Sequence, residues 1–150
     1  QFPKYSAAER LKILIVDDES MTRVVHSRYV KRVFPSATIM CAKDGKEALE
    51  LTQTFHPTVI ISDYAMPEMD GFEFINACKK IEAVRSIPVI VITGEDSAAS
   101  KSALLLAGAD AVINKPIAPE TLHKVLQDTL SRTSYMCREL CLLQIPAVCG

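Results

Sequence analysis

The feature that most constrains the fold is a series of five short apolar runs separated by longer segments of helical period. The runs are KILIV at 12–16, ATIMCA at 37–42, TVIIS at 58–62, PVIVI at 88–92 and DAVIN at 110–114. Residues 13–16, 59–61 and 89–92 are continuously apolar, which is typical of strands covered by helices on both faces. The pattern therefore predicts a central parallel sheet of five strands.

The segments between these runs predict five helices. Apolar residues recur at helical spacing in four of them: Met21, Val24, Val25 and Val33; Ala48, Leu51 and Phe55; Phe74, Ile75, Cys78 and Ile81; Leu122, Val125, Leu126 and Leu130. A less clearly patterned helix is expected at 97–107. Strand and helix thus alternate five times. Right-handed crossovers then give a doubly wound α/β sheet, whose chemistry lies outside the carboxyl ends of the strands.

Length and composition fit one domain with tails. Of the 150 residues 49% are hydrophobic, and we expect an N-terminal arm over 1–11, the domain over 12–132 and a C-terminal tail or helix extension over 133–150. The chain begins at Gln1 rather than Met, which indicates a processed product or a piece of a longer protein.

Charge and hydropathy exclude some partners. The 17 basic and 18 acidic side chains nearly cancel, so direct binding to nucleic acid or to an anionic membrane is not expected. No apolar run approaches the roughly 18 residues of a membrane span, and there is no signal-peptide pattern. The sequence therefore predicts a cytoplasmic protein.

The cysteine and histidine residues are expected to lie outside any reactive site. The odd number of cysteines, Cys41, Cys78, Cys137, Cys141 and Cys149, indicates reduced thiols rather than a disulfide framework. Cys137 and Cys141 share a helical face, but no histidine nearby completes a zinc site, and packing is the favoured interpretation. His26, His56 and His123 are expected at the surface.

Polar residues follow four of the predicted strands. Asp17 and Asp18 follow the first strand and Asp63 the third, at what becomes one edge of a parallel sheet. Carboxylates about 5 Å apart would repel by roughly 3 kcal/mol per pair at an effective dielectric of 20, so a cation is required. Lys115 after the fifth strand supplies one charge, and Mg²⁺ (or Mn²⁺) bound by carboxylate oxygens supplies two.

This inventory suits phosphoryl chemistry. A carboxylate attacks phosphorus when a metal and a cation neutralise the transferring oxygens, and Asp63 is the candidate nucleophile. Thr93, after the fourth strand, and Lys115 would donate to phosphoryl oxygens.

Four motifs then carry a resemblance. The segments ILIVDDES, IISDYAMPEMDG, VITGE and INKPI, in this order and spacing, resemble the receiver domain of two-component response regulators, the CheY-like family. The resemblance covers roughly residues 11–132 and implies a flavodoxin-like sheet with strand order 2-1-3-4-5. It also implies a signalling module rather than a general enzyme, which takes phosphate from a sensor histidine kinase or a histidine phosphotransfer protein. A downstream protein or an output domain outside this chain would respond.

The resemblance also implies residue roles. Asp63 corresponds to the phosphoacceptor, Asp18 to the direct metal ligand, Asp17 to the assisting acid, the Ala65 backbone carbonyl to a further metal ligand, and Thr93 and Lys115 to the groups that hold the phosphoryl. In the family, the face built from the fourth helix, fifth strand and fifth helix rearranges on phosphorylation. We expect any dimer to form through that face or the C-terminal tail. We also expect a cis peptide bond before Pro116.

One position departs from the family pattern. Where Tyr or Phe often precedes the lysine by three residues, this chain has Val112, which cannot act as an aromatic reporter of the threonine's position. Ala65 and Gly94 beside the site are small, which predicts no unusual shielding of an acyl phosphate. Tyr64, next to the acceptor in sequence, is expected to point away from it.

Simpler interpretations exist for each residue. Asp17 and Asp18 could cap the first helix, and Asp63 could be an ordinary turn former. Two other functions also compete, namely a phosphorylation-independent interaction domain and an aspartyl-phosphate phosphatase. Ala65 argues against the phosphatase, because alanine cannot protonate a leaving group.

Overall fold

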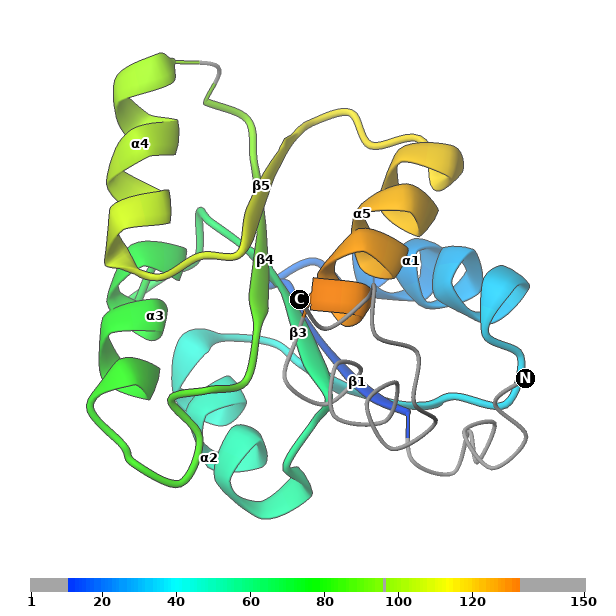
Figure 1. The fold of residues 1–150 in the computed structure, drawn as a ribbon, viewed down its shortest axis with the longest axis horizontal. Helices are drawn as coiled ribbons and strands as arrows, with labels where there is room; N and C mark the ends of the chain where they lie inside the picture. The colour runs from blue at the N-terminus through cyan, green and yellow to red at the C-terminus, as the bar shows by residue number, and fades with distance from the viewer. Residues whose placement is uncertain (1–10, 96, 133–150) are drawn as a thin grey trace, which may run out of the picture.

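The structure is a computed structural model that describes residues 11–95 and 97–132. Its elements are β1 (Lys12–Val16), α1 (Ser20–Val33), β2 (Thr38–Ala42), α2 (Gly45–Phe55), β3 (Val59–Asp63), α3 (Gly71–Lys79), β4 (Val89–Thr93), α4 (Ala98–Ala107), β5 (Ala111–Asn114) and α5 (Pro119–Arg132). All neighbouring strands pair in parallel, in the order β2-β1-β3-β4-β5. Helices α1 and α5 lie on one side of the sheet and α2, α3 and α4 on the other (Figure 1). The predicted doubly wound fold is confirmed.

The sheet has a hydrophobic core on each face. Leu14 packs with Phe74 of α3 on one face, whereas its neighbour Ile13 packs with Leu122 of α5 on the other. Alternate residues of the strand therefore bury opposite sides, and all four of these side chains are fully buried. This explains why the central strands are continuously apolar rather than alternating.

Two strands extend one residue further than the sequence predicts. Asp63 is the last residue of β3 and Thr93 the last of β4, because sheet hydrogen bonds continue past them. Tyr64 N donates to Ile92 O at 2.9 Å, and Lys115 N donates to Thr93 O at 2.9 Å. Both polar side chains are thus held by the sheet rather than by loops.

The buried face of α1 differs from the predicted one. Met21 and Val24 are 71% and 45% exposed, whereas His26 and Val30, four residues apart, are the buried residues of this helix. The apolar pattern shows that a helix forms, but the packing against α5 selects the His26 and Val30 stripe. The expectation that His26 lies at the surface is wrong.

Helix α3 begins in a tightly packed turn. Asp70 is its N-cap, and Asp70 and Glu73 form a reciprocal capping box. A Cβ at Gly71 would lie 3.0 Å from Tyr64 Cα and 3.1 Å from Asp63 O, which are both backbone positions. Glycine therefore lets α3 start directly against the end of β3. The helix ends at Lys79, so Ile81 lies beyond it.

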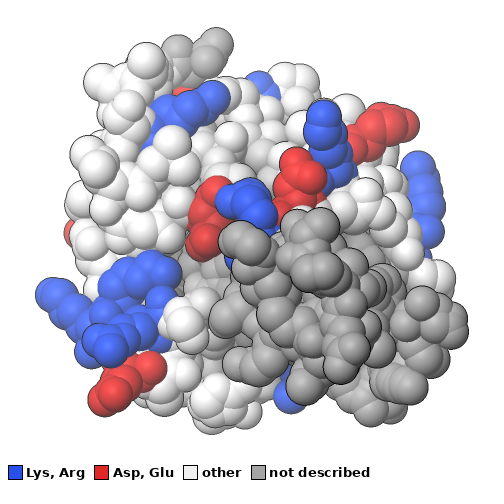
Figure 2. Space-filling model, viewed as in Figure 1, with Lys and Arg blue, Asp and Glu red and all other residues white. Residues whose placement is uncertain are grey.

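Charges are mostly interspersed on the face shown in Figure 2. One group of basic side chains lies at the lower left, where α3 ends in Figure 1.

Among the described residues, no helix is long and apolar enough to cross a membrane. Within the same residues Cys41 and Cys78 are both free thiols, and burial raises the pKa of Cys78 to about 11. Cys137, Cys141, Cys149 and the predicted arm and tail lie outside the described residues, apart from Leu11 at the end of the arm.

Candidate functional site

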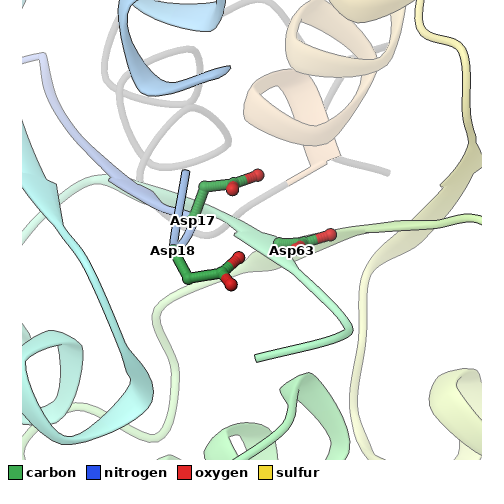
Figure 3. Close-up of side chains that lie close together, drawn as sticks. All are labelled: Asp17, Asp18 and Asp63. Carbon is green, nitrogen blue, oxygen red and sulfur yellow. The ribbon is translucent and has the colours of Figure 1, made fainter. Parts of the chain in front are cut away.

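Three carboxylates meet at the carboxyl edge of the sheet. Asp17 and Asp18 follow β1, Asp63 ends β3, and one oxygen of each lies within 4.8 Å of the others (Figure 3). Asp17 and Asp63 are 3% and 4% exposed, while Asp18 is exposed. The strand order explains this arrangement, because β1 and β3 are neighbours in the sheet although 42 residues lie between them in the sequence.

Neither Asp17 nor Asp18 caps α1. The N-cap of that helix is Glu19, and its side chain makes no capping hydrogen bond. Asp17 Oδ1 instead accepts from Glu19 N at 2.9 Å, which fixes the carboxylate toward the site. The simpler interpretation of these acids as helix caps is therefore wrong.

Burial makes the charged form of Asp17 costly. Burial, assisted by the charges of Asp63 and Asp18, raises the pKa of Asp17 from 3.8 to about 6, while the Glu19 hydrogen bond and Lys115 act in the opposite direction. A cation close to this buried carboxylate would stabilise its charged form. The arrangement therefore fits a hard divalent ion with oxygen ligands.

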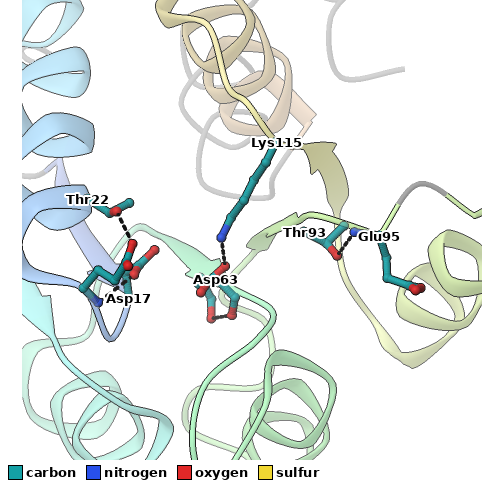
Figure 4. Close-up of polar contacts among 8 residues, drawn as sticks. Asp17, Thr22, Asp63, Thr93, Glu95 and Lys115 are labelled. Carbon is teal, nitrogen blue, oxygen red and sulfur yellow. Dashed lines mark hydrogen bonds and ion pairs between the residues drawn. The ribbon is translucent and has the colours of Figure 1, made fainter.

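Lys115 faces Asp63 across the site. Its Nζ lies 2.9 Å from Asp63 Oδ1, and its side chain is 42% exposed (Figure 4). Burial alone would lower the pKa of Lys115, but the contact with Asp63 and the charges of Asp63, Asp17 and Glu19 more than offset this and raise it. The ammonium is therefore fully charged at neutral pH. The Lys115–Pro116 peptide bond is cis, as predicted.

Asp63 still has capacity for further ligands. Asp63 Oδ1 is buried, and within the part of the chain that the structure describes its contact is the Lys115 ammonium at 2.9 Å. Buried carboxylate oxygens are normally satisfied by donors or metal ions. Lys115 offsets one of the three negative charges in this cluster, and the remaining charge supports the expected metal site.

Thr93 ends the neighbouring strand with its side chain buried. It is 3% exposed, and its Oγ1 accepts from Glu95 N at 2.9 Å (Figure 4). The Glu95 carbonyl in turn accepts from Asn114 Nδ2 at 2.8 Å, which connects this turn to β5. The threonine hydroxyl is thus part of a network that includes the start of the turn before α4.

The other predicted positions lie around this centre. Ala65 is exposed in the turn after β3, and Val112 of β5 packs against the core on the side of α2, α3 and α4. Tyr64 packs against the same core and lines a pocket with Thr93. Val112 is therefore a packing residue in this conformation.

Two residues near the site, Glu95 and His26, are not predicted from the sequence. The negative charge of Glu19 helps to raise the pKa of Lys115, and the backbone N–H of Glu95 donates to the Thr93 hydroxyl oxygen. His26 is buried, and its burial and the charge of Lys115 lower its pKa, although Asp63 acts in the opposite direction. Glu19 was visible as a third acid after the first strand. The roles of Glu95 and His26 depend on the fold and leave no signal in the sequence.

The fold and the charged edge define a class of protein, namely flavodoxin-like α/β domains with an acidic site at the strand ends. The chain belongs to the response regulator receiver domain family, whose model matches residues 13–127. It is therefore a receiver domain of two-component signalling.

Known relatives agree with this assignment. The chain is 34% identical over 123 residues to the probable transcriptional regulator ycf27 of Cyanophora paradoxa, covering 81% of this chain and 49% of that protein. It is 34% identical over 125 residues to the response regulator MprA of Mycolicibacterium vanbaalenii, covering 83% of this chain and 52% of that protein. The chain thus spans about half the length of the curated relatives it matches.

A solved structure of a chemotaxis protein has a similar fold. The chemotaxis protein CheY4 of Vibrio cholerae superposes with a TM-score of 0.73 and 36% sequence identity, covering 79% of this chain and 98% of that one. The similarity extends over nearly the whole of that receiver.

Proposed function

We propose that Asp63 accepts a phosphoryl group from the phosphohistidine of a sensor kinase or a phosphotransfer protein. One observation carries the proposal. Asp63 is 4% exposed at the end of a buried strand, with the Lys115 ammonium 2.9 Å from its Oδ1. A fixed carboxylate beside a permanent cation has the arrangement that attack on phosphorus requires.

The chain's own groups account for most of the chemistry. An Asp63 oxygen forms the new bond to phosphorus while the bond from phosphorus to the histidine nitrogen breaks, and the imidazole leaves with the bonding electron pair. Lys115 offsets the negative charge of the phosphoryl oxygens, and the Thr93 hydroxyl can donate to one of them after it turns from Glu95 N.

The acidic cluster would hold the divalent ion. Asp17, Asp18, Asp63 and the backbone carbonyl of Ala65 are the proposed ligands for Mg²⁺ (or Mn²⁺). When bound, the ion supplies positive charge that offsets the phosphoryl oxygens during transfer. The raised pKa of Asp17 and the three clustered carboxylates, of which Lys115 offsets one charge, support this assignment.

The signal then passes to a protein surface. Phosphorylation adds about two negative charges at the edge of the sheet, which is a strong local perturbation. We place the response on α4, β5 and α5, and assign the output to a separate protein or to a domain outside this chain. Two of the matched relatives are named as regulators and are about twice as long, which supports the second possibility.

The proposal is tested by incubating the protein with Mg²⁺ and phosphoramidate and measuring its intact mass. Wild type should gain one phosphoryl group, and the Asp63→Asn variant should gain none. Asp128→Asn, an exposed acid on α5, is the matched control and should behave as wild type. An undiminished gain in Asp63→Asn would refute the assignment.

A further inference from the structure

A second feature of the molecule is a pocket between the start of α3 and α4. It has a volume of about 100 Å³ and is lined by Tyr64, Phe72, Thr93, Glu95, Ser100, Ala103 and Leu104. Sites for small-molecule ligands usually enclose roughly 300 to 1,000 Å³. This pocket therefore fits a single side chain of a partner rather than a cofactor or metabolite.

The walls of the pocket are aromatic and aliphatic. Tyr64 packs against the core beside Leu104, and Phe72, on the first turn of α3, remains 37% exposed. The faces of such rings carry partial negative charge, so they attract organic cations as well as apolar groups.

The charged groups around the pocket select between these two possibilities. Glu95 is exposed at the pocket, and its Oε1 accepts from Ser100 Oγ at 3.0 Å, which holds the carboxylate there. Asp70 and Glu73 add two more carboxylates at the start of α3, the helix whose first turn carries Phe72. The three carboxylates give this side of the pocket a negative potential, which complements a cation.

We infer that this pocket binds the guanidinium side chain of an arginine presented by a partner protein, with an affinity that depends on the phosphorylation of Asp63. Arginine fits better than lysine because its planar group stacks on rings while it donates to carboxylates. The partner is therefore a basic segment rather than an apolar helix face.

Thr93 provides the connection to phosphorylation. It lines the pocket, and its hydroxyl oxygen accepts from the backbone N–H of Glu95 at 2.9 Å. If the hydroxyl turns toward a phosphoryl group on Asp63, that hydrogen bond is lost and the residue carrying the pocket's carboxylate is released. This step rests on the proposed function, whereas binding of arginine to the unmodified protein does not.

The test is a titration of the ¹⁵N-labelled protein with N-acetyl-arginine amide, followed by the backbone amide shifts of Tyr64, Thr93 and Leu104. We expect saturable shifts with arginine and none with N-acetyl-leucine amide. Equal binding of the leucine compound, or no saturation with arginine, would overturn the inference.

Variants separate the pocket from the general surface charge. Glu95→Gln should weaken arginine binding roughly two- to fivefold, the contribution of an exposed ion pair, and Phe72→Leu should weaken it through loss of the ring. Glu82→Gln changes the net charge equally at an exposed residue outside the pocket lining and should have no effect. If both variants weakened arginine binding equally, the net charge of the protein would explain the loss of affinity, and the proposed site would be refuted.

A separate titration tests whether arginine binding depends on phosphorylation. With Mg²⁺ and beryllium fluoride, a phosphoryl mimic, the dissociation constant for arginine amide should change at least about twofold, as expected for the loss of one hydrogen bond. An unchanged constant in a protein that phosphoramidate does modify would contradict the inference alone. Failure of phosphoramidate to modify wild type would instead contradict the proposed function.

Discussion

Replacing Asp17 by asparagine should stabilise the metal-free protein, although it removes a proposed metal ligand. Asp17 is 3% exposed, and burial raises its pKa from 3.8 to about 6. Asparagine has nearly the same shape, and its side-chain oxygen can still accept from Glu19 N, a contact of 2.9 Å in the native protein. The substitution therefore removes mainly the cost of burying a charge.

The sign of the pH dependence follows from the raised pKa. Below pH 3.8 the carboxyl is protonated in both the folded and the unfolded chain and costs nothing, and above pH 6 the folded protein must hold a charge that the unfolded chain exposes to water. A shift of about two units corresponds to about 3 kcal/mol at most. The advantage of Asp17→Asn should therefore grow by about 1 to 1.5 kcal/mol between pH 5 and pH 7.5.

Urea denaturation at these two pH values, with EDTA and then with saturating Mg²⁺, measures the effect. Mg²⁺ should stabilise wild type more than Asp17→Asn and so reduce or reverse the difference. Asp128→Asn is the control and should show no pH-dependent gain. Lower stability of Asp17→Asn than of wild type at pH 7.5 without divalent ions, or an equal difference at both pH values, would contradict this prediction.

Three further changes test other parts of the structure. Phe74→Ala should lower the free energy of unfolding by about 3 to 5 kcal/mol, because the ring is fully buried, and a urea midpoint within error of wild type would contradict the described core. Gly108→Ala should cost about 1 kcal/mol in the same assay, because Gly108 has a φ of 122° after α4, and an unchanged midpoint would argue against that backbone. Lys115→Met should destabilise the metal-free protein by about 1 kcal/mol at pH 7.5, a value reduced by solvent exposure of the ammonium, and an increase in stability would refute the ion pair with Asp63.

The sequence predicts the sheet well because burial on both faces leaves a continuous apolar pattern. It also predicts which polar residues meet, since parallel strands bring their carboxyl ends to one edge. It places Asp63 and Thr93 just after their strands, whereas both are the last residues of β3 and β4. The end of a strand depends on hydrogen bonds from its neighbours, and these are not encoded in its own residues.

Other features depend on packing alone. The apolar residues of α1 do not show which stripe faces α5, so neither the exposure of Met21 nor the burial of His26 follows from the sequence. The hydrogen bond from Glu95 N to the Thr93 hydroxyl arises from the shape of one turn. Periodicity carries no information about such a contact.

The most direct test of the central claim is to locate the phosphoryl group. Protein treated with Mg²⁺ and phosphoramidate is reduced with sodium borohydride, which converts an aspartyl phosphate to homoserine, and its peptides are then sequenced by mass spectrometry. Homoserine is expected at position 63 and at no other aspartate. Homoserine at Asp17 or Asp18, or an unmodified position 63 in protein that has gained a phosphoryl group, would contradict it.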